Sequence, residues 1–159
     1  MSLAGPRARA GSAERIVIKL GSGVLSAGGG LDPVKIRRLA QELAQLKAAG
    51  REVIVVSSGA ILAGWKALGL KSRPDSTELK QAAAAVGQSR LMRAWETAFA
   101  RQKTSVAQVL LTRQDLHERR CYLNARNTIF TLLRLGVVPV INESDTVAID
   151  EIRFGDNDV

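Results

Sequence analysis

The chain has 159 residues, of which 46% are apolar and only 4% aromatic, and its formal net charge at pH 7 is +8. This length suits about one domain, with a core built from Val, Ile, Leu and Ala. No apolar run approaches the roughly 20 residues that a membrane-spanning helix needs, so we expect no membrane partner. The single cysteine, Cys121, excludes an internal disulfide and favours a cytoplasmic location.

The positive charge raises the question of a nucleic-acid partner. The basic residues are spread along the chain, mostly on predicted helix exteriors, as at Arg37, Lys66 and Arg93. No basic run alternates with the aromatic residues on which single-strand binders stack bases. We therefore favour a solvated surface that attracts an anionic substrate, and nucleic acid is the less favoured alternative.

The first part of the chain combines a polar arm with two strands and two helices. Residues 1–14 are small, basic and polar, which predicts a disordered arm or a remnant of an expression tag. A β-branched run predicts a strand at 16–20, apolar on both faces. A helix is predicted from the Asp32 cap to the Gly50 stop, with an apolar stripe that includes Leu46. Another strand at 53–56 leads directly into a helix that reaches about residue 68.

The second part continues the alternation. A helix is predicted at 77–101, with residues such as Leu79 in the core and with Gly87 marking a break or close packing. A strand at 105–111, a helix at 119–135 and a strand at 137–141 follow, although Pro139 is awkward in a central strand. This order predicts an α/β fold with a mainly parallel sheet and helices on both faces, a three-layer α/β/α sandwich.

Ligands of such folds bind beyond the carboxyl ends of the strands, and four polar or glycine-rich segments fall there. In the first, Gly21 and Gly23 would let backbone N–H groups approach an anion, and Lys19 would add a charge for phosphate oxygens. A tight turn with a solvated lysine is the alternative. In the second, residues 57–60, a helix start favours a carboxylate or phosphate, although serine is also a routine N-cap.

The third and fourth segments are acidic. Residues 142–145 follow a buried strand, where an ordinary polar loop is the alternative. Residues 154–158 could hold a metal, bind an ammonium group or cap a helix. Phosphate-binding G-x-x-x-x-G-K-[ST], dinucleotide-binding G-x-G-x-x-G and zinc motifs are all missing from the sequence. The single histidine, His117, has charged neighbours, and we assign it no role.

Taken together and in this order, the segments resemble the glutamate 5-kinase family of the amino-acid kinase superfamily. The resemblance covers the chain from Ile16 onward and rests on seven strings: VIKLGSGVL (17–25), VVSSGAILAG (55–64), AAVGQSRLM (84–92), LLTRQD (110–115), YLNARNT (122–128), VVPVINESDTVA (137–148) and FGDND (154–158).

The resemblance implies transfer of the γ-phosphoryl group of magnesium-ATP to the γ-carboxylate of L-glutamate, the first step of proline biosynthesis. ATP and magnesium are the implied cofactors, and no residue is assigned as a metal ligand. Carried over to this sequence, the implied residues are Lys19 and Asp158 for catalysis, Ser58, Asp145 and Asn157 for glutamate, and Gly21, Ser22, Gly59, Gly155 and Asp156 in the phosphate and backbone loops.

Some features depart from the family pattern. Ser22 stands where threonine is common, and Ser144 where asparagine is common, but neither change removes a charge. The family's kinase domain continues past residue 159, so residues 15–159 are expected to form its N-terminal, glutamate-binding part, with little or no activity alone. A homo-oligomer and feedback by proline are also implied.

Other functions stay open. The chain could belong to a kinase for N-acetylglutamate, aspartate, carbamate or a nucleoside monophosphate, although YLNARNT and FGDND favour glutamate. It could form the front of a bifunctional proline-pathway enzyme. A non-catalytic remnant that binds a regulator or partner subunit is the alternative from a different class.

Overall fold

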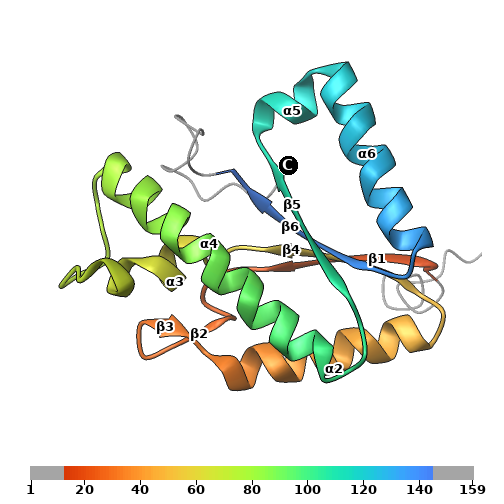
Figure 1. The fold of residues 1–159 in the computed structure, drawn as a ribbon, viewed down its shortest axis with the longest axis horizontal. Helices are drawn as coiled ribbons and strands as arrows, with labels where there is room; N and C mark the ends of the chain where they lie inside the picture. The colour runs from red at the N-terminus through yellow and green to blue at the C-terminus, as the bar shows by residue number, and fades with distance from the viewer. Residues whose placement is uncertain (1–12, 145–159) are drawn as a thin grey trace, which may run out of the picture.

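The computed structural model describes residues 13–144 (Figure 1). Its main sheet has four parallel strands in the order β1–β4–β6–β5. The bounds of these strands are Arg15–Leu20 for β1, Glu52–Ser57 for β4, Val106–Leu111 for β5 and Val138–Glu143 for β6. The helices that flank them are α2 (Pro33–Ala48), α4 (Thr77–Ala100) and α6 (Arg119–Arg134). The predicted α/β architecture with a mainly parallel sheet is confirmed.

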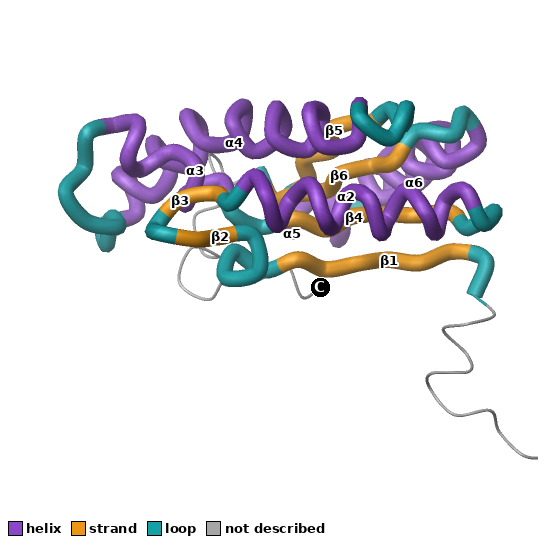
Figure 2. The backbone as a smooth tube through the Cα atoms, turned by 90° about the horizontal axis from the view of Figure 1, so that it is seen from below, coloured by secondary structure: helices purple, strands orange, loops and turns teal. Residues whose placement is uncertain are grey.

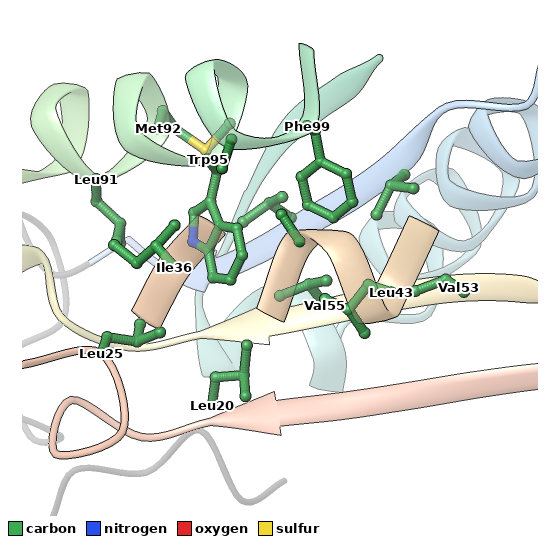
Figure 3. Close-up of a cluster of buried hydrophobic side chains, with 14 residues drawn as sticks. Leu20, Leu25, Ile36, Leu43, Val53, Val55, Leu91, Met92, Trp95 and Phe99 are labelled. Atoms are coloured by element: carbon green, nitrogen blue, oxygen red, sulfur yellow. The ribbon is translucent and has the colours of Figure 1, made fainter. Parts of the chain in front are cut away.

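The main core lies between the sheet and the pair α2 and α4 (Figure 3). Alternate strand residues enter it, and Trp95 and Phe99 of α4 are its largest fully buried side chains. Helix α6 lies on the opposite face of the sheet. There the ring centre of its Phe130 lies 4.4 Å from the guanidinium carbon of Arg15 on β1. Helices therefore lie on both faces of the sheet.

Helix α2 begins and ends as its sequence predicts. The Asp32 carboxylate accepts hydrogen bonds from the backbone N–H groups of Val34 at 2.9 Å and Lys35 at 3.2 Å, and such caps stabilise a helix by about 1 kcal/mol. Gly50 follows the helix in a left-handed conformation, with φ of 83°. Leu46 is partly exposed, so the apolar stripe ends one turn earlier than predicted.

Two predicted burial patterns are wrong in part. We expected β1 to be covered on both faces, but Val17 is 61% exposed, because β1 is an edge strand of the described sheet. Ile54 on the neighbouring strand β4 is only 6% exposed. Leu79 is exposed too, since it lies in the first turn of α4 and borders the loop at 70–76.

Gly87 does not break α4 but marks a close helix contact. Helix α3 (Ala60–Gly64) packs directly against α4. A Cβ atom on Gly87 would lie 1.7 Å from the carbonyl oxygen of Ala60, and one on Gly64 would lie 1.9 Å from that of Ala83. The two glycines therefore permit backbone contact between the helices.

Several short elements differ from the prediction. The helix expected up to residue 68 divides into α3 and a 3₁₀ turn, η1 (Trp65–Leu68). A hairpin of β2 (Ser26–Ala27) and β3 (Gly30–Leu31) and the helix α5 (Arg113–His117) were not predicted. Figure 2 shows the hairpin beside the start of α2.

Pro139 occupies a central strand after all. Strand β6 lies between β4 and β5, and its ladder with β4 pairs only Val140 and Ile141, which follow the proline. The missing N–H of Pro139 therefore falls outside the registered β4–β6 pairs.

Among the helices of residues 13–144, none combines the length and the apolar character that a membrane span requires.

Candidate active site

The carboxyl ends of β1, β4 and β6 lie side by side at one edge of the sheet. Lys19 pairs in register with Val56, which in turn pairs with Ile141. The backbone N–H of Ser58 donates to the carbonyl of Leu20 at 3.0 Å, so the second polar segment begins beside the first. Because the strands are parallel, the structure brings the predicted segments at 21–23, 57–60 and 142–144 together.

Lys19 lies on the face of the sheet opposite the main core. The next residue, Leu20, is 6% exposed and belongs to that core, and neighbouring side chains on a strand point to opposite faces. Lys19 itself is exposed, one residue before the end of β1. Its side chain therefore lies at the strand end, where the resemblance implies a phosphate contact.

The loop after β1 is open above its glycines. The N–H of Val24 donates to the carbonyl of Gly21 at 3.0 Å, and the fully buried Leu25 fixes the far end of the loop. A Cβ atom on Gly21 or Gly23 would meet nothing within 4 Å in the described structure. Neither glycine has a positive φ. Packing and backbone conformation therefore do not explain these two glycines, whereas close approach of a ligand would.

The second segment differs from a simple helix cap. The N-cap residue of α3 is Gly59, which has φ of 114° and makes no side-chain cap bond. The fully buried Ser57 instead accepts a hydrogen bond from the Trp95 indole at 3.0 Å, and half-buried Ser58 follows it. Neither serine therefore occupies the N-cap position of this helix. Because α3 has only five residues, its dipole adds little to anion binding.

The end of β6 contains buried polar groups. Asn142 is 4% exposed, and its Nδ2 donates to Oε1 of Gln88 on α4 at 2.8 Å. The buried Nε2 of Gln88 and the buried Oε1 of Glu143 have no hydrogen-bond partner within residues 13–144. Such groups normally find partners, so this edge of the sheet has unused hydrogen-bonding capacity.

Five predicted site residues lie outside the described residues, and their roles stay predictions: Asp145, Gly155, Asp156, Asn157 and Asp158. Within residues 13–144, no group of three His, Cys, Asp or Glu side chains could hold a metal ion. The structure therefore brings together Lys19, Ser58 and the glycine loops, and leaves the last acidic segment untested.

Sequence reasoning missed two residues that support this edge. Trp95 falls in the helix predicted at 77–101, and Gln88 appears only within the string at 84–92, yet each binds a buried polar residue at a strand end. No local signal could have revealed these pairs, which are 38 and 54 residues apart in the sequence. The two residues of each pair come into contact only because α4 packs against the sheet.

The end of β5 carries a reciprocal cap that the sequence could have revealed. The Thr112 hydroxyl accepts from the N–H of Asp115 at 3.1 Å, and the Asp115 carboxylate accepts from the N–H of Thr112 at 2.7 Å. The Asp115 carboxylate also accepts a hydrogen bond from the Thr112 hydroxyl at 2.8 Å. The two bonds that the carboxylate accepts, first from the Thr112 backbone and then from its hydroxyl, lower the pKa of Asp115. The T-x-x-D spacing at 112–115 is a capping-box signal.

A parallel sheet with a lysine, glycine loops and serines at adjacent strand ends is typical of a phosphoryl-transfer enzyme. Residues 14–159 match the model of the amino acid kinase family, and the chain belongs to that family.

Individual relatives within this family carry a more specific name than the family itself. The glutamate 5-kinases of Geobacter metallireducens and Citrifermentans bemidjiense are 61% and 58% identical to it over 146 residues, and that of Thermus thermophilus is 55% identical over 147. The match covers 91–92% of this chain but only 39–40% of the length of these relatives.

Proposed function

We propose that this chain provides the glutamate-binding part of an enzyme that phosphorylates the γ-carboxylate of L-glutamate with ATP. The product is L-glutamyl 5-phosphate, which makes this the first step of proline biosynthesis. The observation that carries the proposal is the identity of 53–61% to glutamate 5-kinases over nearly the whole chain. The arrangement of polar segments at adjacent strand ends supports it.

The chemistry needs charge stabilisation more than acid–base catalysis. A glutamate side chain has a pKa of about 4.3, so its carboxylate is already ionised at pH 7. A carboxylate oxygen forms a bond to the γ-phosphorus of ATP while the bond to the β,γ-bridging oxygen breaks, and ADP leaves with that electron pair. Because two anions must approach each other, the site needs cations and N–H donors.

The described residues fit these needs in part. Lys19 supplies a cation at the end of β1, and the backbone at Gly21 to Gly23 is open to a phosphate. Ser58 would hold glutamate, together with Asp145 and Asn157 outside the described residues. Magnesium would come with ATP, and we assign no step to a protein-bound ion, because residues 13–144 offer no ligand cluster for one.

The remaining proposed roles follow from the family resemblance. Ser22, Gly59, Gly155 and Asp156 would line the phosphate and backbone loops, and Asp158 would help to organise the catalytic lysines. A cytoplasmic location, a homo-oligomer and feedback by proline belong to the same proposal. Other acceptors, such as N-acetylglutamate or aspartate, are the nearest alternatives.

Calorimetric titration with L-glutamate tests the proposal directly. We expect binding that is selective over D-glutamate and at least about tenfold weaker in Ser58→Ala and Asp145→Ala variants, because each loses a hydrogen bond to a charged group. Ser72→Ala is the matched control, since Ser72 is exposed in the loop before α4. Tighter binding of N-acetyl-L-glutamate than of L-glutamate would contradict the proposed substrate.

A further inference from the structure

A second concave surface lies between α2 and α4, away from the strand ends. It is a groove of about 580 Å³. We call it the arginine groove, because its lining includes four arginines and no acidic residue. Its charged and hydroxyl-bearing lining residues are Arg37 of α2 and Ser89, Arg90, Arg93, Thr97 and Arg101 of α4 and its C-cap.

The arginines of α4 form one stripe on the helix. Arg90, Arg93 and Arg101 are separated by three and eight residues, so at 100° per residue they lie on one side, over a length of about 16 Å. The inward side of the same helix carries Trp95, which is fully buried and bonds to Ser57. Helix α4 therefore separates the arginine groove from the candidate active site.

The four guanidinium groups are not neutralised by neighbours. Each of these arginines is exposed, and none forms an ion pair within the described part of the chain. By contrast, Arg38 on the next position of α2 pairs with Glu42 at 3.2 Å. An anionic ligand could therefore supply the negative charge that complements these arginines.

We propose that the arginine groove binds a small, multiply phosphorylated anion. Guanidinium groups match phosphate oxygens with paired hydrogen bonds, which ammonium groups do not. The volume of the groove falls in the range of small-molecule pockets. Two small residues, Ala94 and Ala98, also line it and leave room for a ligand between the helices.

Two macromolecular partners fit the groove less well. A nucleic acid would normally stack its bases on aromatic side chains, and none lines the groove. A protein partner would need about 800 Å² of complementary surface on this side, whereas the arginines surround a concavity. The inference does not depend on the proposed kinase activity, because its residues differ from those of the strand ends.

Calorimetric titration of the 159-residue chain with sodium tripolyphosphate tests the proposal. We expect binding that weakens as salt rises and that is about tenfold or more weaker in the double variant Arg90→Gln, Arg93→Gln. The matched control is Arg119→Gln, Arg120→Gln, which changes the net charge equally at two exposed residues of α6. Glutamine is a good helix former, so both variants should keep the parent's circular dichroism spectrum.

The possible results separate clearly. Retained affinity in the control and loss in the α4 variant would support a site at the groove. Equal loss in both variants would show attraction to net charge alone and overturn the proposal. No heat from the folded parent chain would also overturn it. Tight binding of a single-stranded RNA oligonucleotide together with weak binding of tripolyphosphate would also overturn the proposal. That result would indicate a nucleic-acid-binding surface instead.

Discussion

The indole N–H of Trp95 donates a hydrogen bond of 3.0 Å to the hydroxyl of Ser57, and both side chains are fully buried. The bond joins the last third of α4 to the last residue of β4, directly before Ser58. A core tryptophan thus helps to hold the strand end at which the candidate active site lies.

This pair predicts a separation of stability from binding between two adjacent serines. We expect Ser57→Ala to lower the free energy of unfolding by about 1–3 kcal/mol, because it leaves the Trp95 N–H buried without a partner. Ser58→Ala should cost less stability, since Ser58 is only half-buried, but should weaken L-glutamate binding more. Urea unfolding and calorimetry of both variants measure the two effects. A larger loss of stability in Ser58→Ala would contradict this account.

The contact between α3 and α4 gives a second prediction. In most helices, alanine is favoured over glycine by about 1 kcal/mol. Gly87→Ala should nevertheless destabilise the chain by about 3 kcal/mol or more, because the added Cβ would lie 1.7 Å from the carbonyl oxygen of Ala60. Thermal unfolding would show the loss. Gly23→Ala is the control, since its Cβ meets nothing within 4 Å and its stability should barely change.

The sequence predicted the parts of the fold whose signals are local. Asp32 and Gly50 marked the ends of α2, and the alternation of strands and helices predicted a parallel sheet whose polar segments meet at one edge. Strand order is not a local signal. The exposure of Val17 on the edge strand and the place of Pro139 in the centre therefore had to come from the structure.

The residues of the candidate site could be predicted from the sequence, but the buried hydrogen bonds that hold the strand ends could not. Lys19, Gly21 and Ser58 were found because they follow strand ends. The bond between Gln88 and Asn142 joins residues 54 apart, and depends on how α4 crosses the sheet. The β2–β3 hairpin and α5 have two to five residues per element, too few to show a period.

The open glycine loop predicts a binding defect without a folding defect. Gly21→Ala should change the free energy of unfolding by less than about 1 kcal/mol, because its Cβ would meet open space and its φ is not positive. In a protein of the full length of the glutamate 5-kinases that it matches, the same change should weaken ATP binding if phosphate approaches the backbone here. Gly59→Ala is the contrast, and should destabilise the fold, since Gly59 has φ of 114°. Unchanged ATP affinity in Gly21→Ala would place the phosphates elsewhere.

The Thr112–Asp115 cap predicts a dependence of stability on acid. The pKa of Asp115 is lowered in the folded chain, so its contribution is present above the ordinary carboxyl pKa and is lost as pH falls through the lower, folded value. Asp115→Asn should therefore be less stable than the parent at pH 7, with a difference that shrinks in strong acid. Thr112→Ala, which removes the cap itself, should cost about 1 kcal/mol. Urea unfolding at neutral and acid pH measures the trend, and a difference independent of pH would argue against the cap.

Cys121 offers a probe of local electrostatics at the start of α6. Burial and then the nearby Glu118 carboxylate raise the pKa of its thiol. Because the thiolate is the reactive form, iodoacetamide should modify Cys121 more slowly at pH 8 than an unperturbed cysteine. Glu118→Gln should speed the reaction by lowering that pKa, whereas Glu96→Gln on α4 is a distant control that should leave the rate unchanged. If Glu118→Gln also left the rate unchanged, burial and the Asp115 carboxylate would account for the raised pKa, and the inferred role of Glu118 would fail.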